Sequence, residues 1–195
     1  CKVIKFLCNN SVVCTFYIRP DHPLPSLDDF VLDTPWQGDA PQAPLPSPIE
    51  GVVIEPLAVH SDKRGDLVVL MSQLHAPVEE IVHVYRVTAR PGSIRAWVYH
   101  DLQYDRLTYT EGRFRVVLYD IRPGSPTRGQ MQVIHAGADN PLRLTIPAHV
   151  VHGVMNEGEG DASFVNMPTR AYDPANPDKR RMPYPDARIP YRFED

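Results

Sequence analysis

Three residues in the middle of the chain have side chains suited to proton transfer or metal binding. His100 and Asp105 stand close together in SIRAWVYHDLQYD (residues 93–105), and His152 lies in LTIPAHVVHGVMN (residues 144–156). A histidine beside a carboxylate is a typical acid–base pair, because the carboxylate orients the ring and stabilises its protonated form. Two histidines with one carboxylate can also hold iron or zinc. The residues alone leave both kinds of chemistry open.

These residues lie in segments with the features of short β-strands. The segments are rich in β-branched residues and are separated by turn residues; examples are GVVIEPLAVH, GDLVVLMS, EEIVHVYRVTA, RFRVVLYDIR, GQMQVIHA and LRLTIP. Their spacing predicts an all-β sandwich or small barrel without an amphipathic helix. Alternate residues of a strand share a face, so His100 is expected to point into the barrel and Tyr99 and Trp97 away from it.

Size and charge limit the function classes. The chain has 195 residues, enough for one well-buried domain, and a net charge of −4, which gives no basis for binding nucleic acid or a membrane surface. The 21 prolines disfavour long helices. The three cysteines are clustered at the N-terminus and do not form a disulfide framework. No run is long enough to cross a bilayer, so we expect a cytoplasmic protein.

The chain is predicted to contain a leader and arm followed by one barrel. Residues 1–20 carry an apolar run after two lysines, faintly like a signal peptide, but no small-residue cleavage site follows, and we expect a dispensable leader. Prolines punctuate residues 20–50 and predict an extended arm rather than a packed element. We therefore divide the chain into an arm (residues 1–50) and a barrel (residues 51–195). The last stretch, from Tyr172, is expected to lie over the barrel as an extended tail.

Several segments resemble those of a known family. PGSIRAWVYHDLQYDRLTYTEG (residues 91–112) and the segment around His152 resemble cupin motifs 1 and 2. LYDIRPGSPTRGQ (residues 118–130) resembles a stretch typical of the dTDP-4-dehydrorhamnose 3,5-epimerases, and DKRGDL, SIRAW and RAYDPANPDKRR resemble three more of their segments in the same order. The resemblance covers about residues 50–193. It implies an RmlC-like cupin, a jelly-roll barrel with a proline-rich N-terminal arm and an extended C-terminal tail.

The resemblance also implies a ligand and a mechanism. Members of this family are homodimers that bind a thymidine-diphospho-keto-sugar and use no metal or other cofactor. A histidine oriented by an aspartate removes the proton α to the keto group, and a tyrosine on the opposite face returns a proton. The family's phosphate-binding arginines fall at Arg64, which often reaches across the dimer, and at Arg95. A barrel histidine near the sugar falls at His152.

The chain differs from the family at the positions of the catalytic residues. The base falls at Val98, the proton-returning tyrosine near Asn166, and a lysine that steadies the enolate near Asp105. The aspartate that orients the base falls near residues 183–184. The binding residues are kept and the epimerase chemistry is not. His100 is the best candidate for a relocated base.

The remaining site predictions follow from that choice. Asp105 would orient His100, Tyr104 would supply an acid or a substrate contact, and Asn166 would contact the substrate. The run Lys179–Arg181 is interpreted as solvated charge.

Three functions remain open. The first is a nucleotide-sugar epimerase or isomerase with a relocated base. The second is a non-catalytic cupin that binds a nucleotide-sugar or another small ligand. The third is a metal-dependent cupin enzyme that uses His100, Asp105 and His152, although the missing histidine at position 98 argues against it.

Overall fold

The computed structural model describes residues 2–8, 11–18, 23, 25–32, 42–72 and 81–194, and it divides into two compact units, residues 1–38 and 39–195. The first unit contains an antiparallel hairpin of β1 (Lys2–Cys8) and β2 (Ser11–Ile18). It also contains one short 3-10 helix, η1 (Leu27–Asp29), whose first turn is capped by the Ser26 side chain. No helix in the described part of the chain is long and apolar enough to span a membrane.

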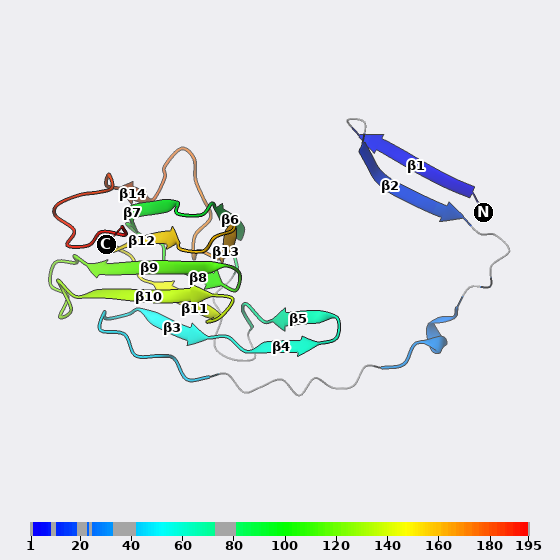
Figure 1. The fold of residues 1–195 in the computed structure, drawn as a ribbon, viewed down its shortest axis with the longest axis horizontal. Coiled ribbons are helices and arrows are strands. Elements are labelled where there is room, and N and C mark those ends of the chain that lie inside the picture. Colours follow the sequence, from blue (N-terminus) through cyan, green and yellow to red (C-terminus); the bar gives the residue numbers. More distant parts are fainter. Residues whose placement is uncertain are drawn as a thin grey trace. The chain divides into compact units, whose positions relative to one another are not determined.

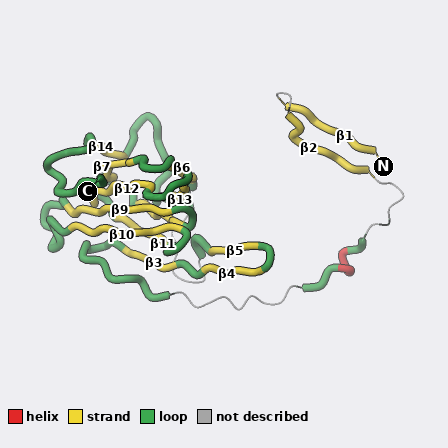
Figure 2. The backbone as a smooth tube through the Cα atoms, in the orientation of Figure 1, coloured by secondary structure: helices red, strands yellow, loops and turns green. Residues whose placement is uncertain are grey.

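The second unit is built from two five-stranded antiparallel sheets (Figure 1). The first sheet has the spatial order β10 (Met131–Gly137), β9 (Arg113–Asp120), β12 (Val150–Asn156), β7 (Ile94–His100) and β14 (Lys179–Arg181). The second has the order β3 (Val53–Pro56), β11 (Leu142–Ile146), β8 (Asp105–Tyr109), β13 (Ala162–Asn166) and β6 (Tyr85–Ala89). A separate hairpin pairs β4 (Val59–Asp62) with β5 (Gly65–Val68). Strands and loops make up the described part of this unit (Figure 2), so the all-β jelly-roll prediction is confirmed.

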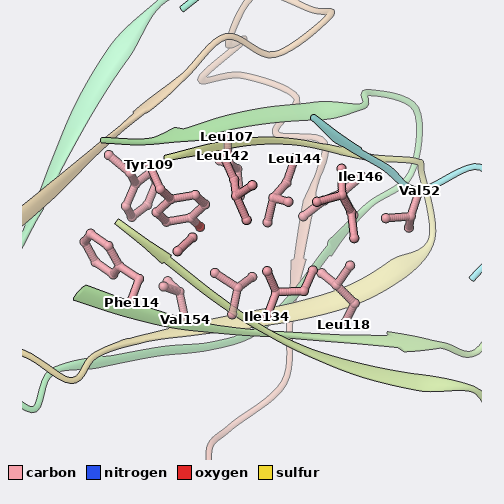
Figure 3. Close-up of a cluster of buried hydrophobic side chains, with 14 of the residues drawn as sticks. Val52, Leu107, Tyr109, Phe114, Leu118, Ile134, Leu142, Leu144, Ile146 and Val154 are labelled. Atoms are coloured by element: carbon pink, nitrogen blue, oxygen red, sulfur yellow. The ribbon is translucent and has the colours of Figure 1, made fainter. Parts of the chain in front are cut away.

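The main core lies between the two sheets (Figure 3). Alternate residues of β11, such as Leu142, Leu144 and Ile146, are buried, as the two-residue period of a strand requires. They face buried side chains of the opposite sheet, such as Phe114 and Leu118. This apolar packing fixes the positions of the strands that carry the candidate site.

Part of the proline-rich segment belongs to this core. Ile49 is 1% exposed and packs with the core residues, and Leu45 forms a β-bridge with Ile54. The expectation that residues 20–50 contain no packed element is therefore wrong for its last residues. Burial of the apolar Ile49 side chain stabilises the packing of this segment on the barrel. The prolines around Ile49 did not indicate that packing.

A second apolar cluster holds the C-terminal tail on the barrel. Trp97 is 1% exposed and stacks on Phe193, with the ring centroids 5.5 Å apart. Ile189 belongs to the same cluster, and Arg115 donates to the backbone carbonyl of Phe193. Trp97 thus points away from the main core, as the strand alternation predicts, and the tail covers it.

Replacing Phe193 with Ala should detach this tail. Phe193 is 2% exposed, and deleting a buried aromatic ring costs about 3 kcal/mol of unfolding free energy. Urea denaturation should show that loss, and the emission of Trp97 should shift to the red as water reaches it. Tyr172→Ala is the control, because that side chain is 65% exposed. An unchanged midpoint for Phe193→Ala would contradict the anchoring role.

Three Asp-x-Arg sequences form the same local ion pair. In each, the Arg backbone N–H and guanidinium donate to the Asp two residues earlier, and the pairs are Asp62–Arg64, Asp120–Arg122 and Asp186–Arg188. Only Asp120 is fully buried, and its carboxylate also accepts from Ser125 and Thr127. The DIRPGSPT sequence therefore fixes the turn between β9 and β10.

Candidate functional site

Strands β7, β8 and β12 bring the three candidate residues together. His100 ends β7 and Asp105 begins β8, while His152 lies on β12 opposite Val98 of β7. The Nε2 atom of His100 is 3.3 Å from Asp105 Oδ2, and Nε2 of His152 is 3.4 Å from the same oxygen. His100, Asp105 and His152 are 5%, 3% and 7% exposed. The structure thus gathers residues 52 positions apart in sequence around one buried carboxylate oxygen.

A ring of polar groups surrounds this cluster. The Nδ1 atom of His152 lies 3.1 Å from the carbonyl oxygen of Val150, and Nδ1 of His100 lies 3.6 Å from Oδ2 of Asp178. The second oxygen of Asp105 accepts hydrogen bonds from the side-chain amides of Gln103 and Asn166. Hydrogen bonds to surrounding groups therefore orient Asp105 and His152, whereas Asp178 lies near His100 without a hydrogen bond to its Nδ1.

The electrostatic environment keeps Asp105 ionised. Burial raises the pKa of this carboxyl, but hydrogen bonds and charge interactions with His100 and His152 outweigh that effect and hold the pKa well below its ordinary value. Burial, followed by the nearby Asp105 charge, raises the pKa of Tyr85. Burial lowers the pKa of Lys179, against the attraction of Asp105 and with the help of Arg181.

A cavity of about 420 Å³ opens beside the cluster. Val98, Asp105 and His152 line it, and so does Tyr85. It also carries three cationic side chains, those of Arg95, Lys179 and Arg181. Cavities of this size with a few converging polar groups are typical of small-molecule sites.

A larger cavity of about 890 Å³ shares Tyr85, Lys179 and Arg181 with the first. His100 lines this second cavity, whereas Asp105 and His152 line the smaller one. The candidate base His100 is therefore not among the residues that line the cavity that contains Val98. His83 lines the larger cavity and contacts the ring of Tyr85.

The predicted binding residues lie in different environments. Asn166 lines the smaller cavity and donates a hydrogen bond to the hydroxyl of Tyr85. Arg95 lines the same cavity, and its exposed side chain donates to the carbonyl of Thr88. β7 brings Arg95 to the open side of the cavity rather than into the core.

Two other predicted residues line neither cavity. Arg64 lies in the turn between β4 and β5, is 83% exposed and pairs with Asp62. Tyr104 is 44% exposed on the loop between β7 and β8.

The structure adds two cations that the sequence interpretation missed. The short strand β14 pairs with β7, with Lys179 opposite His100 and Arg181 opposite Val98. Lys179 and Arg181 thereby share one face and line both cavities, whereas Arg180 pairs with Asp101. The interpretation of this run as solvated charge is wrong for Lys179, which is partly buried. The two-residue period of a strand was the signal that could have placed Lys179 and Arg181 on one face and Arg180 on the other.

Comparisons with known proteins agree with this architecture. The chain is 35% identical over 145 residues to the spore coat polysaccharide biosynthesis protein SpsL of Bacillus subtilis, covering 74% of this chain and 96% of that protein. It is 36% identical over 139 residues to a probable low-salt glycan biosynthesis epimerase of Haloferax volcanii, covering 70% and 88%. A dTDP sugar isomerase structure from Desulfovibrio desulfuricans G20 superposes with a TM-score of 0.71 at 25% identity, covering 75% and 93%. The family model for dTDP-4-dehydrorhamnose 3,5-epimerase matches residues 46–194. The chain therefore belongs to the dTDP-4-dehydrorhamnose 3,5-epimerase family.

Proposed function

We propose that this protein binds a nucleotide-diphospho-keto-sugar in the smaller cavity and does not carry out 3,5-epimerisation with a base at position 98. The observation that carries the proposal is the lining of that cavity. Arg95 and Arg181 provide guanidinium groups, and Val98, His152 and Asn166 lie in the same space. Guanidinium groups bind phosphate oxygens through paired hydrogen bonds, so the diphosphate is placed beside them and the sugar beside Val98 and His152.

The relatives support the same ligand class. One is named for spore coat polysaccharide biosynthesis and another as a probable glycan biosynthesis epimerase. The dTDP sugar isomerase structure has the same fold over most of this chain. A sugar bound through a nucleoside diphosphate agrees with these names and with the cations in the cavity.

The acid–base groups support the second part of the proposal. Val98 has no proton acceptor. His152 faces the Val150 carbonyl with Nδ1 and Asp105 with Nε2, so both ring nitrogens are directed at protein groups. His100 is 5% exposed and points its Nε2 at the same carboxylate. A base must come within about 3 Å of the proton that it removes, directly or through one water.

We also propose a homodimer in which Arg64 reaches the cavity of the second chain. The β4–β5 hairpin that carries Arg64 exposes apolar side chains, including Leu67 at 57% and Val59 at 42%. Exposed apolar strands of this kind gain by pairing with another chain. Sedimentation at micromolar concentration should give a dimer, and a monomer alone would contradict this proposal.

Arg95→Ala and Arg181→Ala should each weaken binding of a dTDP-sugar by about 1.5–3 kcal/mol, because each removes charge-assisted hydrogen bonds to phosphate. Isothermal titration with a dTDP-sugar, dTDP and the free sugar measures the effect and identifies the half of the ligand that depends on the cations. Arg188→Ala is the matched control, since Arg188 is exposed and paired with Asp186. Equal affinity of all three variants for the dTDP-sugar would show that the diphosphate binds away from Arg95 and Arg181.

A further inference from the structure

We propose that His100, Asp105 and His152 form a binding site for one divalent transition-metal ion, with an N₂O set of protein ligands. One potential ligand atom from each of these buried residues lies within 4.8 Å of the others. The proposal goes beyond the nucleotide-sugar ligand and does not depend on it. It also differs from what the family resemblance implies, which is a site without metal.

The separations of the ligand atoms fit a single ion. Two ligands at about 2.1 Å from a tetrahedral ion are about 3.4 Å apart. In the structure the Nε2 atoms of His100 and His152 are 3.3 Å and 3.4 Å from Asp105 Oδ2. Two of the three separations therefore match the spacing around a tetrahedral ion, and the third is within 4.8 Å.

The hydrogen bonding of His152 leaves a lone pair facing the carboxylate. The Val150 carbonyl can only accept, so the Nδ1 atom 3.1 Å away must carry the proton. The Nε2 atom of the neutral ring then presents a lone pair to Asp105 Oδ2. In the metal-free protein a proton between these two atoms makes the hydrogen bond to Asp105, and a metal ion takes the place of that proton.

His100 shows the same arrangement. The Nε2 atom of His100 lies 3.3 Å from Asp105 Oδ2 and 3.4 Å from the Gln103 side-chain nitrogen, so it too is directed at the carboxylate. The Nδ1 atom on the other side of the ring lies 3.6 Å from Asp178 Oδ2 and is buried without a hydrogen-bond partner. Metal-binding histidines typically direct their second nitrogen at a carboxylate or a backbone carbonyl, which raises the basicity of the ligating nitrogen. Asp178 and Val150 occupy those outer positions here.

Three protein ligands leave a coordination position for another group. Asp105 and His152 line the smaller cavity, so a ligand in that cavity has access to the ion from the side of Val98. Sites with three protein ligands and an open position are typical of catalytic rather than structural metals.

The test is a metal titration of the untagged 195-residue chain without nucleotide-sugar. Cys1, Cys8 and Cys14 are replaced with Ser, because thiols bind the same ions, and the protein is first dialysed against a chelator. Calorimetry with zinc should give one equivalent bound, and cobalt should produce visible absorption bands of a site with nitrogen and oxygen ligands. His100→Ala and His152→Ala should each weaken binding more than tenfold, and His149→Ala, with its side chain 51% exposed, should not.

Circular dichroism establishes that each variant is folded, and His100→Gln, His152→Gln and Asp105→Asn replace any that is not. Failure of the unsubstituted site to bind zinc or cobalt would overturn the proposal. So would an affinity that is unchanged in both histidine variants. Nucleotide-sugar binding is measured separately on the metal-free protein, so that failure of the metal site and failure of the proposed function are distinguishable.

Discussion

Solvent deuterium should enter C3 and C5 of dTDP-4-keto-6-deoxyglucose at least about 100-fold more slowly with this protein than with a family member that has histidine at the position of Val98. A positioned general base accelerates proton transfer by about 10²–10⁴. Val98 lines the cavity but cannot accept a proton. His100 stands two residues further along β7, about 6.5–7 Å away, and does not line that cavity. The measurement is exchange at both carbons by NMR, with metal-free protein.

His100→Ala distinguishes the reasons for any exchange that is seen. Fast exchange at both carbons that His100→Ala abolishes would show that the base has moved to His100, and the proposed loss of epimerisation would be wrong. Fast exchange that survives this substitution would exclude both positions as the base. Binding of the sugar is measured in the same samples, because a slow reaction carries information only when the ligand is bound.

Asp120→Asn should destabilise the barrel by about 4 kcal/mol. Removing one partner of a buried, hydrogen-bonded ion pair costs about 3–5 kcal/mol, because the other partner loses its compensating charge. Asp120 is fully buried and accepts hydrogen bonds from Arg122, Ser125 and Thr127. Urea denaturation at neutral pH measures the loss.

Asp62→Asn is the matched control for this prediction. It removes the same charge from the same Asp-x-Arg pattern, but the Asp62 and Arg64 side chains are 47% and 83% exposed. Its unfolding midpoint should not change measurably. Equal effects of the two substitutions would show that burial does not decide the strength of the pair.

The same pair should give the barrel an acid-dependent stability. Hydrogen bonds from Arg122, then from Ser125 and Thr127, outweigh burial and hold the pKa of Asp120 below the usual 3.8. Because the folded pKa is lowered, the contribution is complete above about pH 4 and is lost as the pH falls further. The stability difference between the wild-type protein and Asp120→Asn should therefore narrow below pH 4.

Local patterns predicted the sheet architecture well. The β-branched runs became strands, and the two-residue period placed Leu142, Leu144 and Ile146 in the core and Trp97 on the opposite side. The DIRPGSPT segment also has a local cause, since the hydrogen bonds to its Asp120 carboxylate come from residues within seven positions. Interactions of this kind can be inferred from residues that are close together in the sequence.

The parts of the site that the sequence did not reveal depend on long-range pairing. Lys179 reaches the cavity only because β14 adds to the edge of the sheet beside β7, a contact between residues 79 positions apart. Tyr85 enters the site from β6 and accepts from Asn166 on β13. Nothing near either residue in sequence specifies its partner. Arg64 was chosen from the family resemblance, and its role stays a prediction that needs a second chain.

A structure of the protein with a bound dTDP-sugar tests the central claim most directly. The proposed function predicts that the diphosphate lies within hydrogen-bond distance of the Arg95 and Arg181 side chains, with the sugar facing Val98 and His152. It also predicts that no ring nitrogen of His100 or His152 contacts C3 or C5 of the sugar. A diphosphate bound away from both arginines, or a histidine nitrogen directed at either carbon, would contradict the account.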